Sequence, residues 1–127
     1  MTVRVNQRAG VDAIVVAVEG ELDLDSAPML RAVLDDAVDR GDTRIVVEAP
    51  GLRFCDSVGL SVLLTTHFTC EARGGFLRLA APGDQLLHLL SVVGLSAHVI
   101  AYTSTEAAVR GDRAEIVTVA VDPLDRR

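Results

Sequence analysis

The segment Leu-Arg-Phe-Cys-Asp-Ser-Val-Gly-Leu-Ser-Val-Leu-Leu, residues 52–64, predicts the centre of this fold, because it joins a strand to a helix. Asp56 and Ser57 are both residue types that favour helix N-caps, and apolar residues follow them at helical spacing. We therefore expect Ser57 at a helix N-terminus. Unpaired backbone N–H groups and a partial positive charge there would tolerate a phosphate on its hydroxyl. The plainer interpretation is that Ser57 only caps the helix.

The helix predicted after Ser57 lacks the charged face that a surface helix usually carries. Between residues 58 and 70, His67 is the only side chain that can hold a charge. Ser61, Thr65 and Thr69 recur at helical spacing where charged residues would be expected. Two interpretations fit this pattern. The helix is buried on all sides, or it has an exposed neutral face on which another protein docks.

Three motifs in order along the chain resemble the anti-sigma factor antagonist family, whose domain is called STAS. They are Phe-Cys-Asp-Ser-Val-Gly-Leu at residues 54–60, Gly-Glu-Leu-Asp at residues 20–23 and Val-Gly-Leu at residues 93–95. The similarity runs from about residue 3 to residue 109. In that family the Ser directly after the Asp is phosphorylated, which implies Ser57 here. Many members carry a second Ser or Thr at the next position, where this chain has Val58.

The resemblance implies a regulatory protein and not an enzyme, with no cofactor. In related proteins the unphosphorylated form binds an anti-sigma factor that is also a serine kinase, which frees a sigma factor for transcription. Phosphorylation breaks that complex, and a serine phosphatase restores it. Asp56 would orient the hydroxyl or its loop, and Gly59 would give the partner close access to the backbone. The expected partner-binding residues are Asp23, Asp25, Asp56, Ser57, Val58, Gly59, Ser61 and Thr65.

Three other interpretations of the same residues stay open. The chain could be a STAS binding module of a stressosome or a lipid-transport complex, without a switch at Ser57. A hydrolase using Ser57 is disfavoured, because Asp-Ser-Val-Gly at residues 56–59 is not the Gly-x-Ser-x-Gly nucleophile motif. Finally, Ser57 could be a simple cap in a family member that has lost regulation.

The acidic stretch at residues 20–25 allows two interpretations of its own. Glu21, Asp23 and Asp25 could form a metal site or an acid–base pair, but a solvated loop that leads into a helix is the simpler expectation. Asp25 or Ser26 would cap that helix. This loop and the turn at Asp56 both follow strands, so they could share one edge of the sheet, and the resemblance implies that they do.

Strand patterns alternate with helical patterns along the rest of the chain. The expected helices begin near residues 25, 57, 82 and 103 and end near residues 41, 74, 94 and 111. Met29 in the first helix and Val93 in the third are expected in the core. Thr103 and Glu106 form a capping-box pattern at the start of the last helix. The expected strands cover residues 3–6, 13–19, 44–48, 76–80 and 99–102.

This alternation predicts β-α-β units and an α/β fold. Residues 13–18 are apolar throughout, which is typical of a strand covered on both faces. Arg-Ala-Gly at residues 8–10 would close a hairpin between the first two strands. We expect a single-domain STAS-like fold with a mostly parallel β-sheet, an N-terminal hairpin and helices packed against the sheet.

The end of the chain departs from the family outline. We assign residues 1–111 to the STAS domain and residues 112–127 to a C-terminal extension of uncertain structure. Residues 116–121 read as a strand, which could add an edge strand, continue the last helix or pair with another copy.

Composition excludes several classes of function. The 127 residues are half apolar, enough for one domain. All twelve basic residues are scattered arginines and the net charge is −6, which argues against direct nucleic-acid binding. The absence of Lys excludes a phosphate-loop Lys and a Schiff base. No apolar run approaches the ~20 residues of a membrane span and no signal peptide begins the chain, so we expect a cytoplasmic protein.

The cysteines and histidines give no metal-binding pattern. Cys55 and Cys70 are too few and too widely spaced for a zinc site, and we expect both in the core. His67, His88 and His98 are dispersed, without a pair at the spacing that binds metals. We therefore expect no metal site and no catalytic residue.

Overall fold

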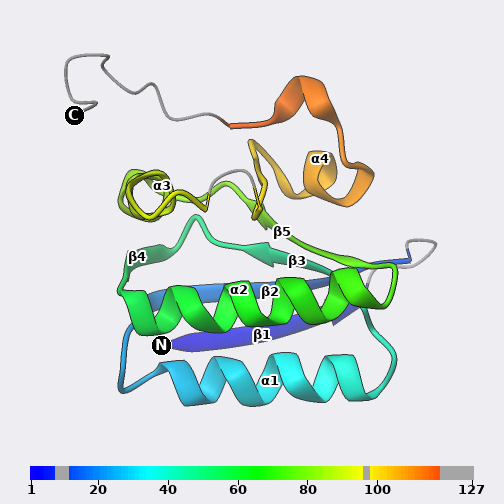
Figure 1. Ribbon diagram of the computed structural model, residues 1–127, viewed down its shortest axis with the longest axis horizontal. Helices are drawn as coiled ribbons and strands as arrows, with labels where there is room; N and C mark the ends of the chain where they lie inside the picture. Colours follow the sequence, from blue (N-terminus) through cyan, green and yellow to red (C-terminus); the bar gives the residue numbers. More distant parts are fainter. Residues whose placement is uncertain (8–11, 96–97, 118–127) are drawn as a thin grey trace.

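The computed structural model describes residues 1–7, 12–95 and 98–117. Helices follow single strands or pairs of successive strands along the chain (Figure 1). The strands are β1 (Thr2–Gln7), β2 (Ile14–Leu22), β3 (Arg44–Glu48), β4 (Leu52–Cys55), β5 (Phe76–Ala80) and β6 (Ala101–Tyr102). The helices are α1 (Ala27–Asp39), α2 (Ser57–Ala72), α3 (Asp84–Val92), α4 (Thr105–Arg110) and the 3-10 helix η1 (Arg113–Glu115).

The sheet confirms the predicted class and topology. Its order is β1-β2-β3-β5-β6, and β4 pairs separately with the end of β2. β1 and β2 are antiparallel, whereas the other strand pairs are parallel. The fold is therefore a mixed α/β domain with a mostly parallel sheet and an N-terminal hairpin. The residues predicted to turn that hairpin, 8–10, lie outside the described residues.

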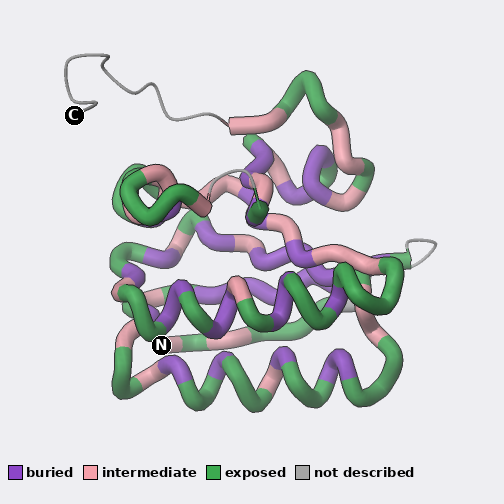
Figure 2. Tube along the Cα trace, in the orientation of Figure 1, coloured by how far each residue is buried: buried purple, intermediate pink, exposed green. Residues whose placement is uncertain are grey.

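Helices cover both faces of the sheet, and β2 shows this in its alternating side chains. Val16 and Val18 join the larger core cluster with Leu30 and Leu34 of α1, and this cluster also includes residues of α2 and α3. Val15 belongs to a smaller cluster on the other face, with α4. Every residue from 13 to 18 is buried, as the continuous apolar run predicts. Figure 2 shows that α1 and α2 each have one buried and one exposed side.

Two predicted boundaries are wrong because distant segments change them. Gly20 and Leu22 belong to β2 and not to a loop, since β4 pairs with both of them. The last helix is capped by Ser104, whose hydroxyl accepts a hydrogen bond from Ala107 N at 3.1 Å, instead of by Thr103. The Thr103 hydroxyl lies 2.5 Å from the carboxylate of Glu115.

Smaller corrections concern exposure and strand length. Met29 and Val93, which the helical pattern placed in the core, are 47% and 45% exposed. Val93 follows the last residue of α3, so its side chain is no longer aligned with the buried face. The strand expected from residue 99 contains only Ala101 and Tyr102.

The chain beyond α4 returns to the edge of the sheet. Ile116 forms an antiparallel bridge with Tyr102, and Val117 N donates to Ala101 O at 2.8 Å. Residues 118–121 of the predicted tail strand lie outside the described residues.

Candidate functional site

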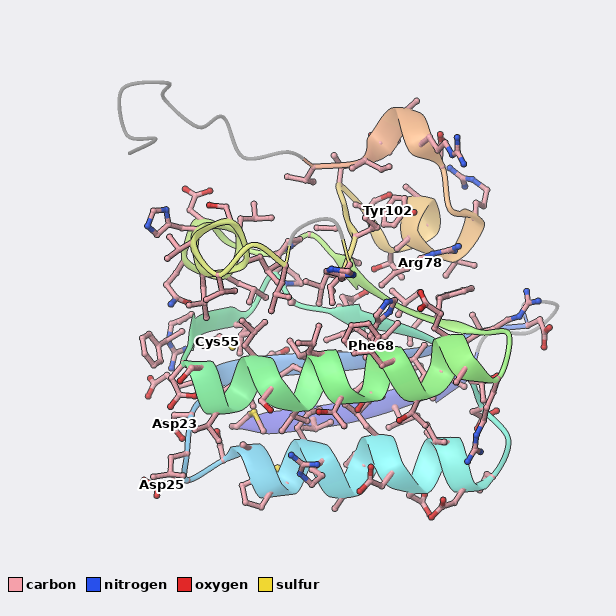
Figure 3. All side chains as sticks on the ribbon, in the orientation of Figure 1. Asp23, Asp25, Cys55, Phe68, Arg78 and Tyr102 are labelled. Carbon is pink, nitrogen blue, oxygen red and sulfur yellow. The ribbon has the colours of Figure 1, made fainter. Side chains whose placement is uncertain are left out.

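Asp56 joins the two segments that follow β2 and β4. Its Oδ1 accepts a hydrogen bond from Gly59 N at 2.8 Å, which makes it the N-cap of α2. Its Oδ2 accepts from Leu24 N at 3.1 Å, and its own backbone N donates to Leu22 O at 3.1 Å. The loop after β2 and the turn before α2 therefore lie at the same edge of the sheet, as expected. Figure 3 shows Asp23, Asp25 and Cys55 at this end of the fold.

Ser57 is the first residue of α2 and is exposed. The cap is Asp56, so the interpretation of Ser57 as the capping residue is wrong. Within the part of the chain that the structure describes, the Ser57 hydroxyl makes no hydrogen bond, and neither do the backbone N–H groups of Ser57 and Val58. An accessible hydroxyl thus sits beside two unpaired donors at a helix N-terminus.

The loop between β2 and α1 is held by its own hydrogen bonds. Asp23 Oδ1 accepts from the backbone N of Asp25 at 3.1 Å and of Ser26 at 3.0 Å. The Ser26 hydroxyl donates to Glu21 O at 2.7 Å. The hydrogen bond from the Ser26 backbone lowers the pKa of Asp23 most, and the Ser26 hydroxyl lowers it further. Asp25 is exposed.

The hydroxyl stripe of α2 faces outward. Ser61, Thr65 and Thr69 are exposed, while residues such as Val62 and Leu63 on the opposite side are buried. Of the two interpretations of this helix, burial on all sides is wrong, and an uncharged exposed face is what the structure has. A groove of about 220 Å³ between α1 and α2 reaches this face; it is lined by Asp35, Val38, Asp39, Thr65, Thr66, Thr69 and Arg73.

Sequence reasoning named Val58 at this site but missed two other exposed apolar side chains near the turn, Leu24 and Phe54. Leu24 is 68% exposed, Phe54 is 44% exposed and Val58 is 39% exposed. They come from the loop after β2, from β4 and from α2, and the hydrogen bond between Leu24 and Asp56 brings the first of them to this turn. Phe54 lies on β4, which pairs with β2 alone among the described strands.

Gly59 has a packing reason to be glycine. A Cβ at this position would lie 2.5 Å from Leu22 Cγ and 2.7 Å from Leu22 O. Gly59 is buried, so its close approach is to the end of β2. Its contact with a partner stays a prediction.

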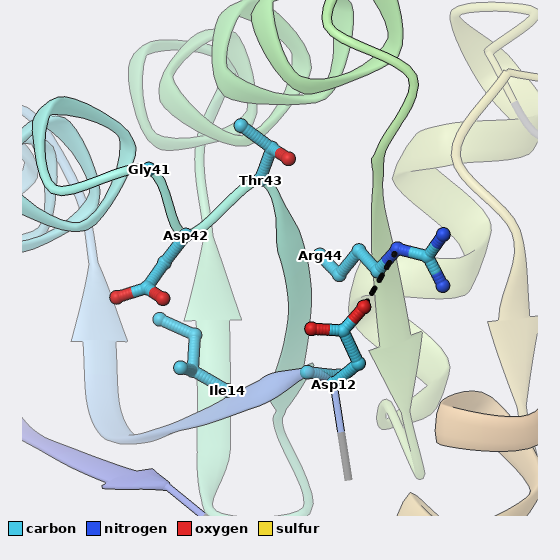
Figure 4. Close-up of a pocket in the computed structure, with 7 residues that line it drawn as sticks. Asp12, Ile14, Gly41, Asp42, Thr43 and Arg44 are labelled. Carbon is cyan, nitrogen blue, oxygen red and sulfur yellow. Dashed lines mark ion pairs between the residues drawn. The ribbon is translucent and has the colours of Figure 1, made fainter.

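Two other features lie apart from this turn. A hollow of about 170 Å³ is lined by residues 12–14 and 41–44, and Arg44 pairs there with Asp12 at 3.7 Å (Figure 4). It lies where β2 and β3 begin, whereas Ser57 follows the end of β4, so it holds none of the candidate residues. Among residues 1–7, 12–95 and 98–117, no group of three His, Cys, Asp or Glu side chains could hold a metal ion.

The two cysteines are buried and free, which confirms the prediction of core positions. Burial raises the pKa of the Cys55 thiol to about 12, with a smaller effect from the Asp56 carboxylate. His67 is also buried, and its Nε2 lies 3.4 Å from Glu71. No helix in the described part of the chain has the length and apolarity to cross a bilayer.

Known proteins resemble this chain in sequence and in fold. A family model described as "Mlab, STAS domain" matches residues 5–101. An anti-sigma-B factor antagonist of Bacillus subtilis (strain 168) is 32% identical over 96 residues, which are 75% of this chain and 86% of that protein.

Two solved structures of SpoIIAA, the second described as a Bacillus cell fate determinant, also resemble this fold. The unphosphorylated form, described as an anti-sigma factor antagonist, has a TM-score of 0.71 and 26% identity and covers 87% of this chain and 97% of its own. The phosphorylated form has a TM-score of 0.67 and 25% identity, and it covers 87% of this chain and 99% of its own. The resemblance inferred from the sequence motifs is therefore confirmed.

Proposed function

Because this chain belongs to the STAS domain family, we propose that it is an anti-sigma factor antagonist whose binding is switched at Ser57. The unphosphorylated form binds an anti-sigma factor with serine kinase activity in the cytoplasm, and thereby frees a sigma factor for transcription. Phosphorylation of Ser57 releases the partner, and a serine phosphatase reverses the step. The observation that carries the proposal is an exposed, unbonded Ser57 hydroxyl beside an uncharged, exposed helix face.

A phosphate on Ser57 is compatible with the folded domain. It would lie near the unpaired backbone N–H groups of Ser57 and Val58, at the positive end of the α2 dipole. The cap made by Asp56 does not use the Ser57 hydroxyl, so phosphorylation breaks no described hydrogen bond. SpoIIAA has been solved in its phosphorylated form, and that structure still resembles this chain. The proposed switch therefore acts on partner contact and leaves the helix folded.

The same phosphate would oppose binding to a neutral surface. It adds about 1.5 to 2 negative charges next to the Asp56 carboxylate. Burying such an unpaired charge in a contact costs on the order of 3–5 kcal/mol, by analogy with broken buried ion pairs. Since about 1.4 kcal/mol corresponds to a tenfold change, the partner affinity should fall by roughly a hundredfold or more.

The docking face that we propose combines small hydroxyls with apolar anchors. Val58, Ser61 and Thr65 of α2 are exposed and uncharged. Leu24 and Phe54 add exposed apolar surface beside them, and apolar anchors of this kind typically form the centre of a protein interface. We place Asp23 and Asp25 at its rim, in the loop that is tied to Asp56 through Leu24 N.

Capture of partners from the source cells tests the switch. The baits are Ser57→Ala, Ser57→Glu and, as a control, Ala32→Glu, which adds the same charge at an exposed position of α1. We expect Ser57→Ala and Ala32→Glu to capture an anti-sigma factor with a kinase domain, identified by mass spectrometry, and Ser57→Glu to lose it. Equal capture by all three would contradict the switch. Stressosome or transporter subunits in place of a kinase would support the alternative binding module.

A further inference from the structure

The strand that leads to Ser57 is paired on one edge only. β4 pairs with β2 from Gly20 to Leu22, and no strand among the described residues pairs with its other edge. Cys55, the last residue of β4, directly precedes the cap Asp56 and Ser57. Backbone N–H and C=O groups on an open strand edge need a hydrogen-bond partner other than a neighbouring strand. The position of Ser57 therefore depends on what holds the free edge of Cys55.

The side chain of Gln85 occupies that edge. Its Oε1 accepts from Cys55 N at 2.8 Å, and its Nε2 donates to Cys55 O at 2.9 Å. One amide thus satisfies both backbone groups of Cys55, as a neighbouring strand would. The orientation of the amide is fixed by chemistry, because a backbone N–H can donate only to the oxygen of Gln85.

Gln85 is attached to a firmly packed helix. It lies in the first turn of α3, while the next residue, Leu86, is 2% exposed and Leu90 is 1% exposed. Both leucines belong to the larger core cluster, so α3 cannot shift without opening the core. The two hydrogen bonds consequently transmit the position of α3 to the end of β4, 30 residues away in the sequence.

We propose that Gln85 is a positioning residue for Ser57. By holding both backbone groups of Cys55, it fixes the plane of the next peptide and hence the Asp56 carboxylate that bonds Leu24 and Gly59. The docking surface around Ser57 is then preorganised before the partner arrives. The functional half of this inference rests on the proposed function, whereas its structural half can be tested in the isolated protein.

The structural test compares Gln85→Ala, Gln85→Glu and the control His88→Ala. His88 is exposed on the same helix, and its side chain makes no described contact. We expect amide NMR signals of residues 55–59 to move and Cys55 N–H exchange to rise about fivefold in Gln85→Ala, since one net hydrogen bond is lost per backbone group. Gln85→Glu keeps an acceptor for Cys55 N but at neutral pH has no donor for Cys55 O and places a carboxylate oxygen against it, so the signals of residues 55–59 should move in this variant too.

Two results of this arm would overturn the inference. One is that residues 55–59 change no more in Gln85→Ala than in His88→Ala. The other is that Gln85→Glu matches the wild type, because a packing role alone would then suffice.

The functional arm measures the affinity of each variant for the kinase-type partner captured by the Ser57→Ala bait. We expect Gln85→Ala to bind about tenfold more weakly than His88→Ala, from the loss of about two net hydrogen bonds of preorganisation. Unchanged affinity, despite moved signals at residues 55–59, would overturn the positioning role. If no such partner is captured, the proposed function fails, while the NMR comparison still decides whether Gln85 holds the turn.

Discussion

At the scale of single residues, the site depends on one carboxylate that serves two segments. Asp56 caps α2 through Gly59 and holds the loop after β2 through Leu24. Ser57 is thereby left without a structural task, and its hydroxyl is accessible. The division of labour between the two residues explains why modification of Ser57 need not disturb the fold.

Removing the cap should destabilise the domain. We expect Asp56→Ala to lower the free energy of unfolding by about 1–2 kcal/mol, because the Gly59 and Leu24 N–H groups both lose their acceptor. Asp56→Asn should lose less, since its single side-chain oxygen can still cap the helix. Urea unfolding followed by circular dichroism gives both values. An Asp56→Ala protein as stable as the wild type would contradict this role.

Acid should weaken the contribution of Asp23. Its pKa is lowered from 3.8, first by the hydrogen bond from Ser26 N, so the folded state favours the ionised form. Its stabilising effect is therefore full above the unfolded pKa and disappears as the pH falls through the lowered folded pKa.

The Asp23 prediction is measured with Asp23→Ala. Relative to the wild type, this variant should lose stability at pH 7, and the difference should shrink progressively below pH about 4 in urea titrations. Asp25→Ala is the matched control, because the Asp25 side chain makes no described hydrogen bond. A difference for Asp23→Ala that stays constant down to pH 2 would refute the assignment.

At the scale of elements, α4 illustrates how a short helix is held by the sheet. It has six residues, too few to be stable alone. Arg78 of β5 stacks over the Phe76 ring with its guanidinium carbon 3.6 Å from the ring centre, and it donates to Ala108 O at 2.9 Å. Arg78 is half-buried (labelled in Figure 3), and this desolvation lowers its pKa.

Arg78→Ala should therefore loosen α4. We expect a loss of about 1–3 kcal/mol in unfolding free energy, from the cation–π contact and the hydrogen bonds to the helix end. Arg78→Lys retains the charge but has no planar guanidinium to stack on the ring. Its unfolding free energy should therefore lie between those of the wild type and Arg78→Ala. Thermal unfolding measures the stability, and amide exchange within α4 locates the change. No faster exchange in α4 for Arg78→Ala would argue against this anchoring role.

Sequence predicted elements well where local signals decide them. β3 and β5 match the expected residues 44–48 and 76–80, because Pro and Gly residues bound these apolar runs. Prediction from the sequence failed where contacts with distant residues set the boundary of an element. β2 continues to Leu22 only because β4 pairs with it, and the cap of α4 shifts to Ser104 because the Thr103 hydroxyl is bonded to Glu115.

At the scale of the whole molecule, the fold brings four segments together at the turn that contains Ser57: the loop after β2, β4, α2 and α3. The sequence identified Asp56 and Ser57 because one motif contains them both. Leu24 and Gln85 could not be identified in this way, since their bonds to Asp56 and Cys55 cross 32 and 30 residues. The two motif residues of the site are therefore adjacent in the sequence, whereas the residues that hydrogen-bond to this turn come from distant segments.

The buried thiols can report whether the packed core of the domain is intact. Cys55 and Cys70 are buried, and desolvation raises the pKa of both thiols. Labelling with a thiol reagent in native buffer should therefore require opening of the core, and its rate should rise with urea in parallel with global unfolding. Rapid labelling of either cysteine without denaturant would contradict the packing described around Ser57.

The central claim concerns the charge on Ser57, and one measurement tests it most directly. Calorimetric titration of the captured anti-sigma factor would compare unphosphorylated protein with protein carrying phosphoserine at position 57, after circular dichroism has established that both are folded. The account predicts affinity weakened by about a hundredfold or more in the phosphorylated protein. Equal affinities for two equally folded proteins would contradict it.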